Sequence, residues 1–217
     1  MRKLVESTFV TLDGVISDPQ VWSPPYWDDE HAAYARELLF EADALLLGRK
    51  TYEGFVQAWP SRSDEYADRI NALPKHVASR TLTETSWNAT LLEGEAFEAV
   101  STLKAEAGEN ILKFGTGELD RTLIENGLVD ELLLWMFPVV AGEGTRLLDG
   151  IDTTHFKLAG TTTFASGIVV LRYGLAQRGS LEKANGLNSG GSSSASNTPA
   201  CSSEQSSTRR EPAPCPR

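Results

Sequence analysis

The spacing of apolar residues changes repeatedly along this chain, between the period of two that marks strands and the period of 3.6 that marks helices. Eight stretches are apolar or alternating, rich in β-branched and aromatic residues, and bounded by turn residues, as strands are. These expected strands are 3–12, 44–48, 75–79, 89–93, 110–114, 130–140, 155–164 and 167–176. Other segments repeat apolar residues every three or four positions and predict helices at 28–42, 51–59, 66–73, 100–107 and 118–126.

The order of these elements predicts the fold class. The run ALLLG, residues 44–48, has apolar residues on both faces, which is typical of a central parallel strand between two layers of helices. Strands and helices alternate at first, but the last strands follow one another without a helix, which favours an antiparallel edge. We therefore predict an α/β fold with one mixed sheet of about eight strands, mostly parallel with an antiparallel C-terminal edge, and helices on both faces.

Composition divides the chain after Gln177. From Arg178 onward there is no aromatic residue and almost no branched apolar residue, so this segment cannot bury enough surface to offset its ordering entropy. We expect residues 1–177 to form one domain and residues 178–217 to be a disordered, low-complexity tail.

The charge of the chain and the positions of its cysteines argue against several kinds of binding partner and catalytic site. The formal net charge of −10 argues against binding to nucleic acid or to an anionic membrane. Both cysteines lie in the tail, so the domain has neither a disulfide framework nor a thiol nucleophile. No apolar run approaches the roughly 18 residues of a membrane helix, and the three histidines lack metal-ligand spacing. We expect a cytoplasmic protein with no metal, membrane or nucleic-acid partner.

Two glycine turns stand where an expected strand meets an expected helix, at Gly48 and at 115–117. Helix N-termini carry unpaired amide donors and partial positive charge, and glycine lets a phosphate approach the backbone. Arg49 and Lys50 add two cations beside the first turn. Glycine between a strand and a helix is usually explained by loop geometry alone, and Arg49 and Lys50 could simply be solvated charges. As phosphate cradles on one sheet edge, the two turns would suit a long ligand with two phosphate ends.

Acidic residues beside apolar segments are candidates for contact with a substrate. Asp13 follows the first strand in a turn, and three acids at 28–30 begin the first helix. The acids at 28–30 also have a structural explanation, because aspartate commonly caps a helix and acids favour its first turn. The aromatic residues of the proline-rich segment 22–27 could line a flat pocket or join the core.

Five segments, taken together and in order, resemble one family: FVTLDGVI, ALLLGRKTYEGF, LPKHVASRTL, FGTGELDRTLIENGLVDEL and FPVVAGEGTRLL. They resemble the stand-alone bacterial members of the dihydrofolate reductase superfamily that are related to the reductase domain of riboflavin biosynthesis. The likeness extends from residue 1 to about residue 176. The deaminase domain that often precedes that reductase is absent from this sequence.

This resemblance implies NADPH as the cofactor. In the family, the GRKT position grips the 2′-phosphate end, and the later glycine turn holds the pyrophosphate. Carried over, this implies Gly48, Arg49, Lys50 and Thr51 at the first site, Gly115, Thr116, Gly117, Glu118 and Leu119 at the second, and Ser79 with Arg80 beside the adenine.

We therefore expect an NADPH-dependent reductase that transfers a hydride to a small planar heterocycle, either pterin-like or resembling a pyrimidine precursor of riboflavin. Asp13 is the first candidate for a substrate-orienting carboxylate and Glu30 the second, with Trp22 in the pocket wall. The alternative is a non-catalytic protein that binds a nucleotide or small molecule on the same fold. Members of the family often form dimers through the antiparallel edge, so the resemblance also implies a homodimer, to which the run LLLWMF could contribute apolar surface. Burial in the core explains this run equally well.

Overall fold

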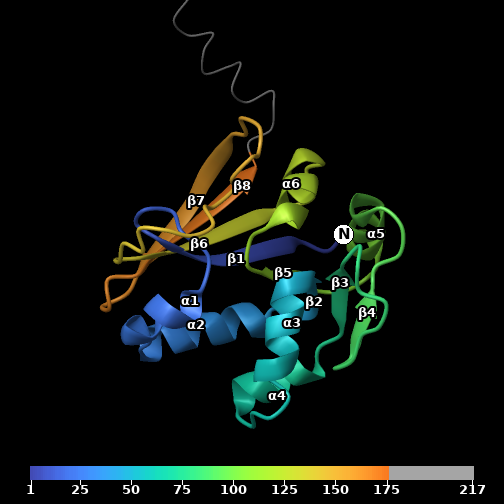
Figure 1. Ribbon diagram of the computed structural model, residues 1–217, viewed down its shortest axis with the longest axis horizontal. Coiled ribbons are helices and arrows are strands. Elements are labelled where there is room, and N and C mark those ends of the chain that lie inside the picture. The colour runs from blue at the N-terminus through green and yellow to red at the C-terminus, as the bar shows by residue number, and fades with distance from the viewer. Residues whose placement is uncertain (176–217) are drawn as a thin grey trace, which may run out of the picture. The chain divides into compact units, whose positions relative to one another are not determined.

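A computed structural model describes residues 1–175 of the chain. Its eight strands form one sheet in the order β4-β3-β2-β5-β1-β6-β8-β7 (Figure 1). The strands are β1 Leu4–Thr11, β2 Ala42–Gly48, β3 Lys75–Ala78, β4 Ala89–Leu91, β5 Asn110–Phe114, β6 Glu131–Phe137, β7 Phe156–Thr163 and β8 Val169–Leu175. The helices are α1 Pro19–Trp22, the short 3-10 helix η1 Pro24–Tyr26, α2 Asp29–Phe40, α3 Arg49–Ala58, α4 Glu65–Ala72, α5 Ala96–Ala105 and α6 Glu118–Glu125.

The pairing of the strands confirms the predicted fold class. Strands β4, β3, β2, β5, β1 and β6 are mutually parallel, so their carboxyl ends meet at one edge of the sheet. Strand β8 runs antiparallel to β6 and to β7, which makes the predicted antiparallel edge. The hairpin of β7 and β8 closes across the two residues between the predicted strands.

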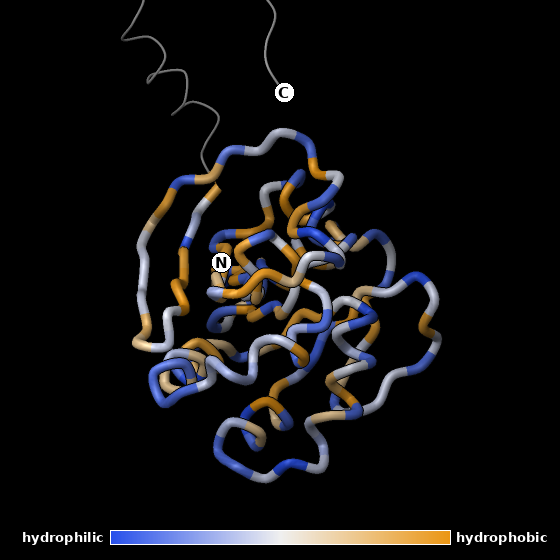
Figure 2. Tube along the Cα trace, turned by 60° about the vertical axis from the view of Figure 1, so that its left-hand side comes forward, coloured by the Kyte–Doolittle hydropathy of each residue, from blue (hydrophilic) through white to orange (hydrophobic). Residues whose placement is uncertain are grey.

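Helices cover both faces of the sheet. Helices α2, α3 and α4 lie below it in Figure 1, over a buried cluster that includes Leu45, Val77 and Trp135. Helices α5 and α6 pack on the opposite face, over a second cluster built around Leu46 and Ile111. In Figure 2 hydrophobic residues run along the strands, whereas the loops around them are mostly hydrophilic. Adjacent residues such as Leu45 and Leu46 therefore serve different cores, which explains why this strand is apolar throughout.

Three local features differ from the expectations or refine them. Helix α3 begins at Arg49 with Gly48 as its N-cap, so the predicted start at Thr51 is wrong. Helices α1 and η1 were not predicted, because three or four residues are too few to show a helical period. Asp28 caps α2, as expected, by accepting a hydrogen bond of 2.8 Å from the His31 amide. The predicted tail, 178–217, lies outside the described residues.

Candidate functional site

The sheet brings the three segments with predicted cofactor-binding residues to one edge. Strands β3, β2 and β5 are neighbours, and Gly48 at the end of β2 pairs with Ala78 at the end of β3. On the other side of β2, Leu46 pairs with Lys113, one residue before the end of β5. The segments 48–51, 79–80 and 115–119 therefore leave the sheet side by side.

The first glycine turn opens directly into α3. Gly48 is the N-cap residue, with a φ of −73° and no side chain to cap the helix. A Cβ placed on Gly48 would meet no other atom within 4 Å. Neither backbone conformation nor protein packing requires glycine here, and the first amides of α3 have no partner within the helix. The turn thus offers open space next to unpaired backbone donors.

The second glycine turn has the same arrangement at the start of α6. Gly117 is the N-cap, in an extended conformation with a φ of −175°, and an added Cβ would again meet no atom within 4 Å. Gly115 differs, because its φ of +71° favours glycine on conformational grounds. The Thr116 hydroxyl is turned to the sheet and shares a 2.8 Å hydrogen bond with the Thr8 hydroxyl. Glu118 and Leu119 supply the first amides of α6.

Two contacts join the turns to one another. The Thr51 hydroxyl donates to the Phe114 carbonyl at 3.5 Å, next to the position of a Cβ on Gly115. Arg80 forms an ion pair of 3.1 Å with Glu118 across the edge, although both side chains are about nine-tenths exposed. The predicted cofactor-binding residues therefore form one continuous surface.

The cations of this surface differ in their surroundings. Arg49 pairs with Glu53 at 3.1 Å along α3, and Arg80 pairs with Glu118. Lys50 is exposed and forms no ion pair with residues 1–175. Exposed ion pairs contribute little free energy, so both arginines can exchange their partners for a stronger anion at small cost.

Asp13, the first candidate for substrate orientation, already forms hydrogen bonds with neighbouring protein groups. Its carboxylate accepts hydrogen bonds from the Thr11 hydroxyl at 2.6 Å and from the amides of Ala141 and Gly142 at 3.1 and 2.8 Å. Arg146 donates to its main-chain carbonyl. These bonds, above all the one from Thr11, hold the pKa of the Asp13 carboxyl well below its ordinary value. Asp13 is therefore ionised and ties the 138–146 loop to the end of β1.

This loop and the first turn are a single packed unit. An added Cβ on Gly144 would lie 2.4 Å from Ser17 Oγ and 2.7 Å from a Val15 methyl carbon, and its φ is +133°. Only glycine fits such a position without a shift of its neighbours. The segments TLDG and GEGTRLL, separate in the sequence, thus meet in the structure.

Glu30 lies in the first turn of α2, and Trp22 is the last residue of α1. Glu30 accepts a 2.6 Å hydrogen bond from the Ala165 amide. The Trp22 indole donates to the Ser17 carbonyl at 3.0 Å, and its ring meets Phe137 edge-on at 5.2 Å. In the described part of the chain no hydrogen bond links Asp13, Trp22 and Glu30 to one another. A hydrogen bond and an ion pair join the segments that carry the cofactor candidates, in contrast to the three substrate candidates.

The RibD C-terminal domain family matches this chain over residues 2–170. The chain belongs to that family. The uncharacterized protein YyaP of Bacillus subtilis (strain 168) is 32% identical over 178 residues, which cover 79% of this chain and 94% of YyaP. A second protein of the same strain, YwjB, also called uncharacterized, is 28% identical over 173 residues, covering 77% of this chain and 95% of YwjB.

Solved structures share the fold of this RibD C-terminal domain. A putative riboflavin biosynthesis protein from Shewanella sp. PV-4 superimposes with a TM-score of 0.60 at 22% identity, covering 82% of this chain and all of the other. A pyrimidine reductase-like protein from Corynebacterium diphtheriae gives a TM-score of 0.56 at 14% identity, over 81% of this chain and 92% of that chain. A diaminohydroxyphosphoribosylaminopyrimidine deaminase/5-amino-6-(5-phosphoribosylamino)uracil reductase from Thermotoga maritima gives 0.56 at 14% identity, over 81% of this chain and 57% of its own.

Reasoning from the sequence did not single out His31, which follows Glu30 in the chain. His31, in the first turn of α2, packs edge-on against Trp135 at 5.1 Å and lies parallel to the exposed Trp27 ring at 5.8 Å. Its Nε2 is buried without a hydrogen-bond partner within residues 1–175, and burial lowers the pKa of the ring although Asp28 opposes this. Its helical spacing to Tyr34 and Leu38 could have placed it on the sheet-facing side of α2.

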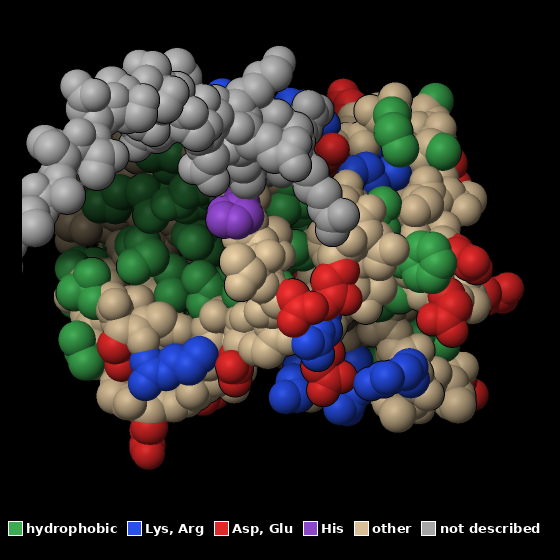
Figure 3. Space-filling view, turned by 90° about the horizontal axis from the view of Figure 1, so that it is seen from above, with side chains coloured by type: hydrophobic (Ala, Val, Ile, Leu, Met, Phe, Trp, Pro, Cys, Tyr) green, Lys and Arg blue, Asp and Glu red, His purple; other side chains and the backbone are tan. Residues whose placement is uncertain are grey.

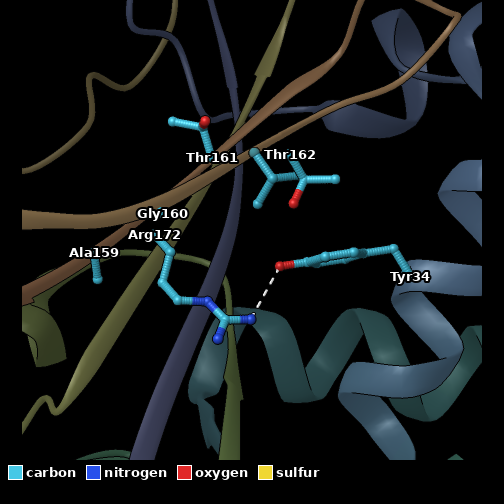
Figure 4. Close-up of a pocket in the computed structure, with 7 residues that line it drawn as sticks. Tyr34, Ala159, Gly160, Thr161, Thr162 and Arg172 are labelled. Carbon is cyan, nitrogen blue, oxygen red and sulfur yellow. Dashed lines mark hydrogen bonds between the residues drawn. The ribbon is translucent and has the colours of Figure 1, made fainter.

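A separate hollow of about 170 Å³ lies between α2 and the β7–β8 hairpin. Figure 4 shows Arg172 reaching across it to the Tyr34 hydroxyl, a hydrogen bond of 3.3 Å. It adjoins the antiparallel edge, which β1 and β6 separate from the glycine turns. Within residues 1–175, no group of three acidic, histidine or cysteine side chains is placed to hold a metal ion, and no helix is long and apolar enough to span a membrane.

Proposed function

We propose that this chain is an NADPH-dependent reductase that transfers a hydride to a small planar heterocycle, most closely a pyrimidine of the riboflavin-precursor type. The observation that carries this proposal is the pair of glycine N-caps, Gly48 and Gly117. Both lie at the same sheet edge and face open space, and neither is needed by the backbone or by packing. A ligand that approaches the backbone closely at two points accounts for both glycines.

The first turn is assigned to the 2′-phosphate end of the cofactor and the second to its pyrophosphate. Lys50 meets the 2′-phosphate with no competing ion pair among the described residues, and Arg49 joins it by leaving Glu53. The amides of Glu118 and Leu119 face the pyrophosphate, while Ser79 and Arg80 adjoin the adenine. When bound, NADPH supplies the hydride and this chain supplies binding and orientation. The family and the names of its structural neighbours support this assignment.

The substrate is assigned to the space between the first turn, the 22–27 segment and the start of α2. Glu30 becomes the first candidate for the orienting carboxylate, because it gives up a single hydrogen bond where Asp13 would give up several. Asp13 then acts through the loop that it holds. Trp22 and the exposed Trp27 offer flat surfaces for a planar ring.

The test is to follow NADPH absorbance while the protein meets a panel of pterins and pyrimidines. We expect oxidation with at least one aminopyrimidine, and a Glu30→Gln variant that still binds NADPH but turns over at least tenfold more slowly. A protein that binds neither NADPH nor its fragments would contradict the proposal.

A second candidate function is binding without turnover. The observation in its favour is that both candidate carboxylates, Asp13 and Glu30, already accept hydrogen bonds from backbone amides and would have to give them up to orient a substrate. Tight NADPH binding with no oxidation by any member of the panel would select this alternative.

A further inference from the structure

A cluster of charged side chains is buried directly beneath the second glycine turn. Glu6 of β1 and Lys113 of β5 pair across neighbouring strands, and Asp120 projects from the first turn of α6. All three side chains are at most 3% exposed. Charged side chains are rarely buried so completely unless they are paired with one another.

Two members of the cluster hold the turn through its backbone. Lys113 Nζ lies 2.6 Å from Asp120 Oδ1 and also donates a hydrogen bond to the Gly115 carbonyl. The other carboxylate oxygen, Asp120 Oδ2, accepts a hydrogen bond from the Gly117 amide. The first and last residues of the glycine turn are therefore fixed from below by one ion pair.

Glu6 is the third member of the cluster, and burial is the strongest influence on its pKa. Glu6 lies 3.8 Å from Lys113 Nζ, and neither of its oxygens has a hydrogen-bond partner in the described part of the chain. Burial raises the pKa of Glu6 well above its ordinary value against the attraction of Lys113, and Asp120 raises it further. Burial also opposes the charge of Lys113, but Asp120 and Glu6 prevail and raise its pKa. Burial thus favours the neutral form of Glu6, whereas the two neighbouring carboxyl groups favour the charged form of Lys113.

Within residues 1–175, the pKa values of Glu6 and Lys113 are shifted only by burial, by one another and by Asp120. Their neighbours on the adjoining strands are apolar, because Glu6 pairs with Leu132 and Lys113 with Leu46. These three side chains are therefore the charged groups that lie directly beneath the 115–117 turn.

We propose that Lys113 and Asp120 are positioning residues for the pyrophosphate of the dinucleotide, because they fix the backbone of the 115–117 turn whose amides face it. This inference rests on the proposed function. The physical reason is preorganisation: a turn already held in its binding shape loses less entropy when a ligand arrives. Neither side chain contacts the ligand itself.

The experiment measures the affinity of the full chain for NADPH and for adenosine 2′-monophosphate, which carries the 2′-phosphate but no pyrophosphate. We expect Lys113→Met and Asp120→Ala each to weaken NADPH binding at least tenfold and to leave adenosine 2′-monophosphate binding within twofold of wild type. The two substitutions remove opposite charges. Weaker binding in both variants therefore identifies the shape of the turn, rather than its local charge, as the cause.

Lys104→Met is the matched control. Lys104 is a second buried lysine, paired with Asp130 and donating to the Leu128 carbonyl, but it lies at the amino edge of the sheet. We expect this variant to lower the thermal midpoint while NADPH affinity stays within twofold of wild type. If Lys113→Met fails to fold, Asp120→Ala carries the same comparison, because it leaves Lys113 with Glu6 as a counter-ion.

The outcomes separate the two proposals. A wild-type protein that binds neither ligand removes the proposed function and this inference with it. If wild type binds both ligands, the inference is overturned by variants that lose both affinities equally, by tighter NADPH binding in Asp120→Ala, or by effects no larger than that of Lys104→Met. None of these three outcomes contradicts the proposed function, because the wild-type protein still binds the cofactor.

Discussion

Arg49 and Lys50 are adjacent at the start of α3, but within residues 1–175 only Arg49 forms an ion pair, with Glu53. We predict that the double substitution Arg49→Ala and Lys50→Ala weakens NADPH binding on the order of a hundredfold, because two charge-assisted hydrogen bonds to a phosphate are lost. NADH lacks this phosphate, so its affinity should change little. Titration of both cofactors at two salt concentrations measures the effect and its screening.

The matched control is Arg121→Ala, which removes an arginine paired with Glu125 in the same way on α6. It should leave both cofactors unaffected. An equal loss of NADPH and NADH affinity in the double variant would show that the pair supports the fold or the pyrophosphate, and Arg80 would then be the next candidate for the 2′-phosphate.

Asp13 contributes to stability through its hydrogen bonds to the 138–146 loop. Its pKa is lowered in the folded state, so this contribution is present above its ordinary pKa of about 4 and is lost as the pH falls further. We predict that Asp13→Asn unfolds at a lower temperature than wild type at pH 7 and that the gap narrows at pH 3. Thermal unfolding at both pH values tests this. An unchanged midpoint with slower turnover would instead support direct contact with the substrate.

Glu6 should act on stability in the opposite direction. Its pKa is raised in the folded state, so its contribution is fully present below its ordinary pKa of about 4.3 and is lost as the pH rises toward the folded value. We predict that Glu6→Gln is increasingly more stable than wild type between pH 5 and pH 8.5, in urea unfolding. A variant that is less stable at pH 8.5 would mean that Glu6 is an ionised partner of Lys113.

Among the elements, the strands and most helices could be predicted because hydrophobic period is a local property of the sequence. Strand β5 and helix α6 were predicted within two residues of where they lie. The contacts that shape the site are not local. Asp13 meets Ala141 and Gly142, and Glu6 meets Lys113, only because of the strand order.

The N-cap of α6 tests whether its glycine serves a ligand or the fold. Gly117 has an extended backbone and open space where a Cβ would stand. We predict that Gly117→Ala leaves the thermal midpoint within about 2 °C of wild type, but weakens NADPH binding at least tenfold, because the methyl group occupies the approach to the amides. Gly144→Ala is the contrasting variant and should lower the midpoint clearly, since its Cβ would collide with Val15 and Ser17. Unchanged NADPH affinity in Gly117→Ala would remove the main support for the second cradle.

At the scale of the whole molecule, the antiparallel side of the sheet is the part least covered by helices. Figure 3 shows hydrophobic side chains gathered over β6, β8 and β7, and the Leu158 side chain of β7 is half exposed. Strand β7 is also the last strand of the sheet, with no partner on its outer side within residues 1–175. We predict a homodimer through this face. Sedimentation analysis should show a dimer that Leu158→Glu weakens and that Phe97→Glu, on α5, does not; a monomeric wild type at tens of micromolar would contradict it.

The place of β1 in the sheet has a consequence for how the chain folds. This first strand lies in the middle, where Leu4 pairs with Ile111 on one side and Val5 with Glu131 on the other. During synthesis β1 therefore emerges long before β5 and β6. The side chains of β1 that are buried in the folded protein cannot be buried until most of the domain has been synthesised. Closing such long loops is slow, because the chain loses conformational entropy before the stabilising contacts between the strands can form. We accordingly expect late, cooperative folding after β6 has left the ribosome, with an aggregation-prone interval before it.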